Sequence, residues 1–498
     1  MAQIEASYGR LRSRFPRGSA RKNRSVIAPR PRPRCGGTPQ LCPRFGVGQT
    51  GTVKTSDRDD LQRRERPDDG CQPMTRNRTA RRSTGLRLAA VIAALMLAGL
   101  VGSAWIGRSR PRVVLEVPGS QPALASGHRV RVNLTPKPAR GVTIDVGGAF
   151  EVRPVGSDRV LLRSAGTQPI SVRATPGGLK VGTQDISVAR IVIHPARSPA
   201  IWVNDHLYRG DLAVYRRSGG RVIAVNVVDL EQYIASVVDS EMPAKFPPAA
   251  RRAQAIVART YVLYQQQLAG AAREFDVYAT TRSQKYLGYQ YRDGRGRKLA
   301  GESQSSRDVA RDTAGMVALY RGELFAAYYS AVCGGRTANG PSVFADAVDA
   351  LVGVPCQWCR AAERYRWNRS VEREQAGRLL SEHFRRQGQP FQRLKTCKVI
   401  AADAAHSGSR FEVGDGTQRY QIAGAALRRL FSGSVLPSPF FTARLDGDRL
   451  LFSGRGHGHG VGLCQWGARG QALDGRSAAR IVATYYPGVQ LVTLDLKR

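Results

Sequence analysis

The stretch that decides the fold is DLEQYIASVVDSEMPAKFPPAARRAQAIVARTYVLY, residues 229–264 of a chain of 498. Asp229 followed by Gln232 three positions later is the arrangement of a capping box at the start of a helix. Apolar side chains then recur at helical spacing, at Leu230, Ile234, Val237 and Val238. Proline disfavours helical geometry in the residue before it, so Met242-Pro243 ends this helix. A second helix is predicted from Pro248 to about Gly270.

Glu241 continues the apolar stripe of the first helix and is the candidate for chemistry. A carboxylate on such a stripe must lose its water, which disfavours the anion. The negative end of the helix dipole acts in the same direction, so both effects raise the pKa of Glu241. A glutamate that keeps its proton is what a glycosidic general acid requires. The alternatives are a solvated glutamate at a frayed helix end, or one paired with a nearby arginine such as Arg251, Arg252 or Arg259.

Short apolar runs separated by Gly, Pro or Asp fill the region before this helix pair. Residues 111–199 alternate apolar and polar side chains in runs such as VVLEV, RVRVNL and VTIDV, a pattern typical of a β-sandwich or barrel. We predict a mixed α+β chain with a β-rich accessory region over 111–199. A catalytic domain follows over 200–498, with a few helices packed on strands.

Residues 88–106, LAAVIAALMLAGLVGSAWI, form an unbroken run of apolar and small side chains behind a basic segment. This order is typical of a signal peptide or a membrane anchor, and the run is long enough to cross a bilayer. A buried core helix is the alternative. We therefore expect an extracytoplasmic protein, located in the periplasm or cell wall and associated with the membrane through residues 88–106.

Residues 1–87 are predicted to be a disordered basic leader, because their arginine- and proline-rich composition cannot build a packed core. Residues 1–73 are either an upstream over-extension of a chain that starts at Met74 or a disordered cytoplasmic tail. The formal net charge of the whole chain is +39, which attracts polyanions. The sequence contains no zinc-finger, basic-zipper or aromatic-basic nucleic-acid module, so the expected polyanion is a cell wall or lipid surface.

Three blocks in this order resemble the stage II sporulation protein D (SpoIID/LytB) family. The first is the E-M-P helix end followed by AQAIVARTY, the second is TTRSQKYLGY at 280–289, and the third is GHGVGLCQWGARGQAL at 458–473 with TYYPG at 484–488. Together they extend the resemblance over about residues 201–489 and make it far more specific than a single motif.

The resemblance implies a peptidoglycan lytic transglycosylase that cleaves the MurNAc-GlcNAc linkage, with Glu241 as its catalytic acid and base. Such an enzyme closes a 1,6-anhydro ring on the muramoyl sugar and needs no cofactor. It also needs no second carboxylate, unlike hydrolases that place a carboxylate pair across the scissile bond. Asp276 is the only rival carboxylate that we single out.

The same resemblance implies a set of substrate-binding neighbours: Arg259, Tyr261, His459, Gln465 and Trp466. Each also has a structural interpretation. Arg259 could brace the fold through a carboxylate pair, the two aromatic rings could belong to the core, and His459 could be a satisfied structural histidine. Two other functions stay open: a non-catalytic wall-binding protein that enhances an amidase, and an ordinary glycan hydrolase.

Some members of this family carry a Cys/His metal loop where this chain reads FDVYATTRSQ, so that site is not expected here. Cys356 and Cys359, however, have the two-residue spacing of a zinc knuckle. With Cys333 and Cys464 they could supply four thiolates to a structural zinc. One or two disulfides are the alternative, natural outside the cytoplasm. Cys397 stays unpaired in both schemes.

Overall fold

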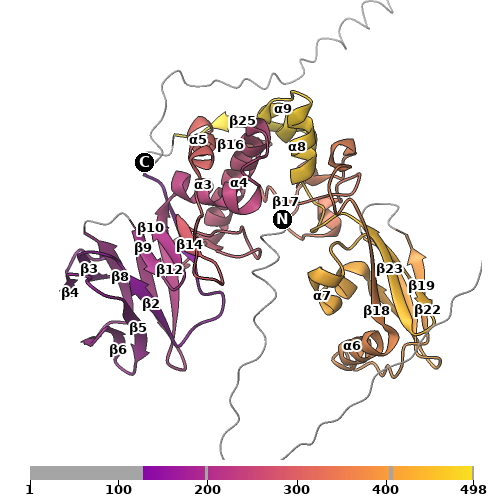
Figure 1. Cartoon of the computed structure of the whole chain (residues 1–498), viewed down its shortest axis with the longest axis horizontal. Helices are drawn as coiled ribbons and strands as arrows, with labels where there is room; N and C mark the ends of the chain where they lie inside the picture. The colour runs from indigo at the N-terminus through magenta and orange to yellow at the C-terminus, as the bar shows by residue number, and fades with distance from the viewer. Residues whose placement is uncertain (1–126, 197–199, 403–407, 496–498) are drawn as a thin grey trace, which may run out of the picture. The chain divides into compact units, whose positions relative to one another are not determined.

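The computed structural model describes residues 127–196, 200–402 and 408–495. Its secondary structure is mixed α+β, which confirms the predicted fold class (Figure 1). The leader 1–87 and the apolar segment 88–106 lie outside the described residues, so their assignments stay predictions. None of the helices in the described ranges combines the length and the apolar character that crossing a bilayer requires.

Two sheets form the N-terminal β-sandwich. The first has the strand order β13-β1-β12-β11-β8-β3-β4 and the second β15-β14-β10-β9-β2-β5-β6-β7. The first sheet comprises β1 (Arg129–Asn133), β3 (Phe150–Pro154), β4 (Leu162–Ser164), β8 (Arg190–Pro195), β11 (Asp211–Arg217), β12 (Arg221–Asp229) and β13 (Val277–Tyr278). The second comprises β2 (Gly141–Asp145), β5 (Ile170–Thr175), β6 (Gly178–Val181), β7 (Gln184–Ile186), β9 (Ala200–Val203), β10 (His206–Arg209), β14 (Gln290–Arg292) and β15 (Lys298–Ala300).

The sandwich crosses the domain boundary expected at residue 200. Strand β1 pairs with β12 in antiparallel register, Val130 opposite Val228, and β2 pairs with β9. Buried side chains of both sheets then form one core, which also takes in residues of the following helices. The predicted β-rich region 111–199 is therefore not a separate module in the described structure, because its strands complete sheets with strands that follow it in sequence.

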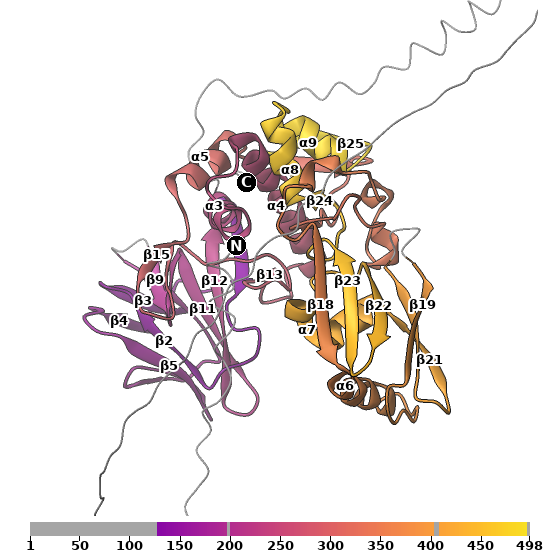
Figure 2. The same cartoon turned by 45° about the vertical axis from the view of Figure 1, so that its right-hand side comes forward.

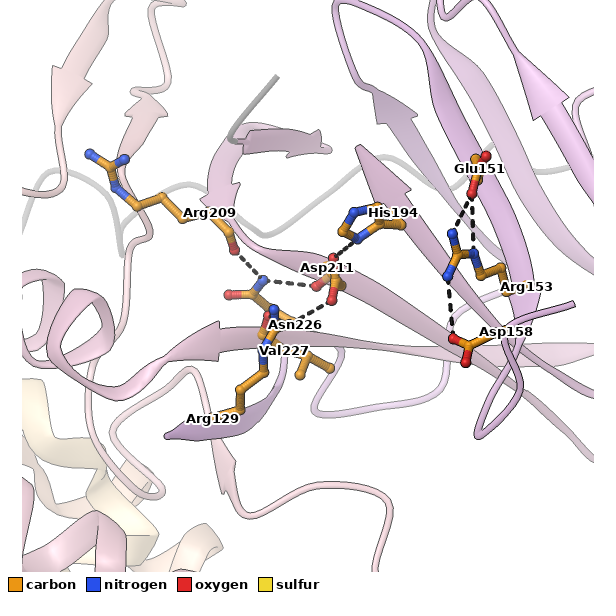
Figure 3. Close-up of polar contacts among 9 residues, drawn as sticks. All are labelled: Arg129, Glu151, Arg153, Asp158, His194, Arg209, Asp211, Asn226 and Val227. Carbon is orange, nitrogen blue, oxygen red and sulfur yellow. Dashed lines mark hydrogen bonds and ion pairs between the residues drawn. The ribbon is translucent and has the colours of Figure 1, made fainter. Parts of the chain in front are cut away.

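Polar side chains link four inner strands of the first sheet, β1, β12, β11 and β8 (Figure 3). Asp211 on β11 accepts a hydrogen bond from Arg129 on β1 at 2.5 Å and lies 2.6 Å from the Nδ1 of His194 on β8. Asn226 on β12 donates to the carbonyl oxygens of Arg209 and Asp211 at 2.8 and 3.1 Å. These contacts fix the register of β12, the strand that leads into the first helix.

The predicted helix pair is present at the expected positions. Helix α3 (Leu230–Glu241) begins at Asp229, whose carboxylate accepts from the N–H groups of Glu231 and Gln232. Helix α4 (Pro248–Ala269) has proline in its first turn and ends at Gly270, where φ is +62°. Helix α5 (Gln304–Asp312) contacts both. These helices close one end of the sandwich core (Figure 2).

A second core lies on the other side of α4 and contains the C-terminal segment. Its strand pairs are β16 (Met316–Tyr320) with β25 (Val489–Thr493), and β17 (Tyr329–Ser330) with β24 (Leu463–Cys464). Its helices are α8 (Gln465–Leu473), α9 (Ala478–Tyr485) and the short 3-10 turns η1 (Gly340–Ser342), η2 (Asp349–Leu351) and η3 (Gln357–Cys359). Both α8 and α9 contact α4, so the C-terminal block GHGVGLCQWGARGQAL with TYYPG meets the block AQAIVARTY on this helix.

A third core belongs to a lobe between η3 and the C-terminal block. Its elements are β18 (Arg366–Glu372), α6 (Arg373–Arg385), β19 (Thr396–Ala401), β20 (Arg410–Gly414), β21 (Arg419–Ala423), α7 (Gly424–Val435), β22 (Phe441–Asp446) and β23 (Arg449–Arg455). They form the sheets β18-β23-β22 and β19-β20-β21 (Figure 1). The arginine-rich segment 366–385 is thus a strand followed by a helix.

Arg259 of α4 and Glu231 of α3 form an ion pair with no exposed side-chain area on either residue. Removing one partner leaves an uncompensated buried charge, so we predict that Arg259→Leu lowers the free energy of unfolding by about 3–5 kcal/mol. Urea denaturation followed by circular dichroism measures this loss. The matched control is Arg378→Leu, which breaks an exposed pair with Glu374 on α6 and should change little. Equal effects of the two substitutions would contradict the structural role of the buried pair.

Candidate active site

Glu241 is the last residue of α3 and is half-buried. Its Oε1 accepts a hydrogen bond from the backbone N–H of Lys285 at 2.9 Å. Its Oε2 lies 3.5 Å from the amide nitrogen of Gln465, the first residue of α8. Three segments that are far apart in sequence therefore meet at this carboxyl group.

The segment that carries Lys285 is held in place by a buried glutamine. Gln284 accepts a hydrogen bond from the hydroxyl of Tyr233 on α3 at 3.0 Å and donates to the carbonyl of Ala258 on α4 at 3.3 Å. Because Gln284 is fixed to both helices, the next backbone N–H is directed at Glu241. These contacts explain how the TTRSQKYLGY block takes part in the site: it is attached to both helices and donates a hydrogen bond to Glu241.

Burial raises the pKa of Glu241, because the carboxylate form loses hydration at the helix end. The Lys285 N–H, the Gln465 amide, the Lys285 ammonium and the Tyr329 hydroxyl act in the opposite direction, and the net shift of the pKa is upward. Burial in turn lowers the pKa of Lys285. The site thus holds a carboxyl group that keeps its proton to a higher pH than an ordinary glutamate.

Other acidic side chains near these helices are neutralised by arginine. The pairs are Glu231 with Arg259, Asp239 with Arg251, Asp276 with Arg131 and Glu302 with Arg209. No arginine in the described part of the chain pairs with Glu241, which separates it from this group. Asp276, the rival carboxylate, has 1% of its side chain exposed and two hydrogen bonds from the Arg131 side chain, so it is a structural residue.

Tyr329 on β17 also belongs to this site, although no motif in the sequence pointed to it. Its hydroxyl is buried and makes no hydrogen bond of good geometry within the described residues, yet it lies near enough to Glu241 to affect the pKa of that carboxyl group. The parallel pairing of β17 with β24 sets Tyr329 opposite Leu463, two positions before Gln465. Only this long-range pairing brings Tyr329 to the site, so no local sequence pattern could have found it. Lys285, in contrast, lies inside the block TTRSQKYLGY.

His459 is half-buried and packs edge-on against the rings of Phe344 and Tyr328, with centroids 5.0 and 5.9 Å away. Its Nδ1 accepts the N–H of Val461 at 3.2 Å. Burial lowers its pKa to about 4, although contact with the Tyr329 backbone opposes the shift. His459 is therefore neutral at pH 7 and supports the Tyr329 segment rather than acting as a charged group.

Gln465 is buried and reaches both Glu241 and Gln254, at 3.5 and 3.4 Å from its amide nitrogen. The neighbouring Trp466 turns the other way, edge-on to Phe246 at 5.5 Å between ring centroids, with the guanidinium of Arg469 near both rings. Of the five predicted neighbours, Gln465 thus contacts Glu241 directly, while Trp466 covers the turn just after α3.

Arg259 and Tyr261 point into the interior. The guanidinium of Arg259 is completely buried, donates to Glu231 at 2.9 Å and to the carbonyl of Met316 at 2.9 Å. Tyr261 is 7% exposed and belongs to the sandwich core. Both follow the structural interpretation given with the sequence, and the guanidinium of Arg259 is not accessible to a glycan.

The four predicted metal or disulfide cysteines converge in the second core. Cys333, Cys356, Cys359 and Cys464 are all buried, and their sulfur atoms lie within 4.8 Å of one another. Cys397 is half-buried in the third core, away from this group.

Two surface hollows of the protein, around Arg217 and Phe275 and around Arg369 and Arg444, do not include Glu241 in their lining.

Comparison with known proteins agrees with this geometry. Residues 218–320 match the family described as Stage II sporulation protein (SpoIID), and residues 358–462 match Domain of unknown function (DUF8618). The first match covers both helices, Glu241 and Lys285. The second coincides with the lobe that has its own core.

Curated relatives extend the similarity beyond this domain. An uncharacterized protein of Brachyspira hyodysenteriae is 28% identical over 376 residues, 74% of this chain and 94% of the relative. Stage II sporulation protein D of Bacillus subtilis is 26% identical over 302 residues, 57% of this chain and 79% of the relative. A Bacillus subtilis protein named Amidase enhancer is 23% identical over 301 residues, 52% of this chain and 40% of the relative.

The raised pKa of Glu241 predicts how stability depends on pH. The folded chain holds this proton more tightly than the unfolded chain, so the stabilisation is complete below the unfolded pKa of about 4.3 and is lost as pH rises through the raised folded pKa. Glu241→Gln cannot ionise and escapes this loss. We expect its melting temperature to exceed that of the wild type at pH 8, with the difference shrinking towards pH 4. A matched control is Glu323→Gln at an exposed position, which should give no such trend. Equal melting temperatures of the wild type and Glu241→Gln at every pH would contradict a raised pKa of Glu241 in the folded chain.

Proposed function

The chain belongs to the SpoIID family, and on that premise we propose that it is a peptidoglycan lytic transglycosylase with Glu241 as its single acid and base. The observation that carries the proposal is the state of this carboxyl group. It is half-buried, has no arginine partner in the described residues, and has a raised pKa. These properties suit a general acid, whereas a carboxylate that only braces the fold pairs with a guanidinium, as Asp276 does.

In the first step, protonated Glu241 donates its proton to the oxygen of the MurNAc-GlcNAc linkage. The bond between this oxygen and the muramoyl anomeric carbon breaks, and positive charge develops at that carbon. The carboxylate that remains is stabilised by the N–H of Lys285 and the amide of Gln465. The ammonium of Lys285 adds a favourable charge.

In the second step, the Glu241 carboxylate removes the proton of the muramoyl 6-hydroxyl while that oxygen bonds to the anomeric carbon. The products are a 1,6-anhydromuramoyl end and a free GlcNAc 4-hydroxyl, and Glu241 is protonated again. One carboxyl group serves both steps, so no second one is needed to activate water. This requirement fits a site whose nearby acidic residues are paired with arginine.

We expect Tyr329 to hydrogen-bond to the sugar bound beside Glu241. Its buried hydroxyl lacks a well-formed partner in the described residues, and a buried polar group of this kind is stabilised by any ligand that hydrogen-bonds to it. His459 holds the Tyr329 backbone and stays neutral, because its pKa is about 4. Neither residue competes with Glu241 for the proton at pH 5 to 8.

A second function is favoured by one comparison. The relative named Amidase enhancer suggests a wall-binding protein that stimulates an amidase without cutting the glycan itself. The net charge of +39 suits attachment to an anionic wall under either function. A binder, however, has no use for a buried carboxyl group with a raised pKa.

Replacement of Glu241 tests the proposal. We expect Glu241→Gln to reduce the formation of anhydromuramoyl ends from purified glycan strands by about 10²- to 10⁴-fold, because the amide cannot transfer a proton. The products are measured by chromatography and mass spectrometry, with Glu323→Gln as the matched control. Full activity of Glu241→Gln would refute the assignment. Reducing ends would indicate a hydrolase, and an intact glycan with a faster added amidase would indicate the enhancer.

The pH profile provides a second, independent check. Catalysis requires protonated Glu241, so the rate falls as pH rises through its pKa. The Lys285 ammonium lowers that pKa, and its removal in Lys285→Met should raise it and move the alkaline limb to higher pH. Lys398→Met, at an exposed position of the lobe, should leave the limb in place. A limb that moves to lower pH in Lys285→Met would contradict this electrostatic coupling.

A further inference from the structure

Four cysteines from three separate segments meet in the interior of the second core. Cys333 follows β17, Cys356 directly precedes η3, Cys359 is the last residue of η3, and Cys464 ends β24. Each has at most 1% of its surface exposed. Their four sulfur atoms all lie within 4.8 Å of one another, and those of Cys333 and Cys359 are 3.6 Å apart. The fold therefore gathers four soft ligands around one point.

The spacing of the sulfur atoms fits a single tetrahedral ion. With a zinc–sulfur bond of about 2.3 Å, the six sulfur–sulfur edges of a tetrahedron are each about 3.8 Å. A disulfide requires about 2.05 Å and draws its two cysteines away from the other pair. The thiolates of an iron–sulfur cluster bind different iron atoms and must spread further apart. We propose that Cys333, Cys356, Cys359 and Cys464 bind one structural zinc ion.

The surroundings of the sulfur atoms supply the hydrogen bonds that metal-bound thiolates receive. The N–H groups of Cys333 and Gly467 both point at the sulfur of Cys464, at 3.3 Å. The hydroxyl of Tyr485 lies 3.2 Å from the sulfur of Cys356. Such outer contacts orient ligands and stabilise their negative charge. Cys464 also caps the N-terminus of α8, where the helix dipole favours an anion.

Close packing around the cluster depends on Gly467. A Cβ at this position would lie 2.6 Å from the sulfur of Cys356 and 2.0 Å from the hydroxyl of Tyr485. Only glycine lets the first turn of α8 approach the sulfur atoms closely enough for its N–H to reach Cys464. The helix start and the four ligands thus form one packed unit.

The ion would also position the candidate active site, an inference that rests on the proposed function. Cys464 directly precedes Gln465, which contacts Glu241. Cys333 lies four residues after Tyr329, on the chain that leaves β17. A zinc bridge between these segments fixes the two strands that bring Tyr329 and Gln465 to the carboxyl group. It is therefore a positioning element and takes no part in the proton transfers.

Metal content tests the zinc site without any assay of activity. The full chain is purified without added metal or chelator, with the three cysteines at positions 35, 42 and 71, which lie outside the described residues, replaced by serine. We expect inductively coupled plasma mass spectrometry to find one zinc per chain. Cys359→Ser should lower this content at least several-fold, and Cys397→Ser, the matched control in another core, should keep it.

Cobalt substitution gives a measurement that does not depend on whether Cys359→Ser folds. Exchange of the ion in the otherwise intact protein should give the visible absorption of tetrahedral Co²⁺ with four thiolates. Intact masses under non-reducing conditions that show lost thiol hydrogens and no bound metal would overturn the proposal in favour of disulfides. Equal loss of metal in Cys359→Ser and Cys397→Ser would overturn it as well. Because no glycan is involved, these results leave the assignment of Glu241 untouched.

Discussion

The buried ion pair between Arg259 and Glu231 is the contact on which the site depends. Glu231 lies in the first turn of α3 and Arg259 in the middle of α4, so the pair fixes the two helices side by side. Two further hydrogen bonds, from Gly315 to Glu231 and from Arg259 to the carbonyl of Met316, attach the strand β16 to the same point. Burying two charges is expensive unless both are fully satisfied, and here both are. The far end of α3, with Glu241, is thereby held against the rest of the molecule.

Charge compensation distinguishes Glu241 from the other carboxyl groups near the helices, which pair with arginine. The chain is rich in arginine, and the planar guanidinium pairs with carboxylates through two hydrogen bonds. Near the helices this arrangement places a guanidinium beside the carboxyl groups of Glu231, Asp239, Asp276 and Glu302. Glu241 instead faces a backbone N–H, an amide and a half-buried lysine. Weaker compensation leaves burial as the dominant effect on the pKa of Glu241, which is therefore raised.

Local features of this fold were predictable from sequence, whereas its long-range pairings were not. The cap at Asp229, the proline at the start of α4 and the glycine at its end are signals within a few residues, and the helices match them. The position of Glu241 on its helix followed from the same periodicity, together with the family resemblance. The merging of residues 129–195 with later strands, and the approach of Tyr329 through β17 and β24, depend on contacts between distant segments that no local pattern encodes. For the same reason, the sequence did not distinguish a substrate-binding role of Arg259 from a structural one; its buried ion pair with Glu231 does.

The lobe with the third core enters and leaves the chain through a single stem. Its first strand, β18, pairs in antiparallel register with its last, β23, so that Arg366 lies opposite Arg455. The intervening residues pack on one another and keep a separate set of buried side chains. An insertion whose ends are neighbours can change in length or content without pulling on the strands beside Glu241. This single stem allows the lobe to vary as a unit while the arrangement of residues around Glu241 stays the same.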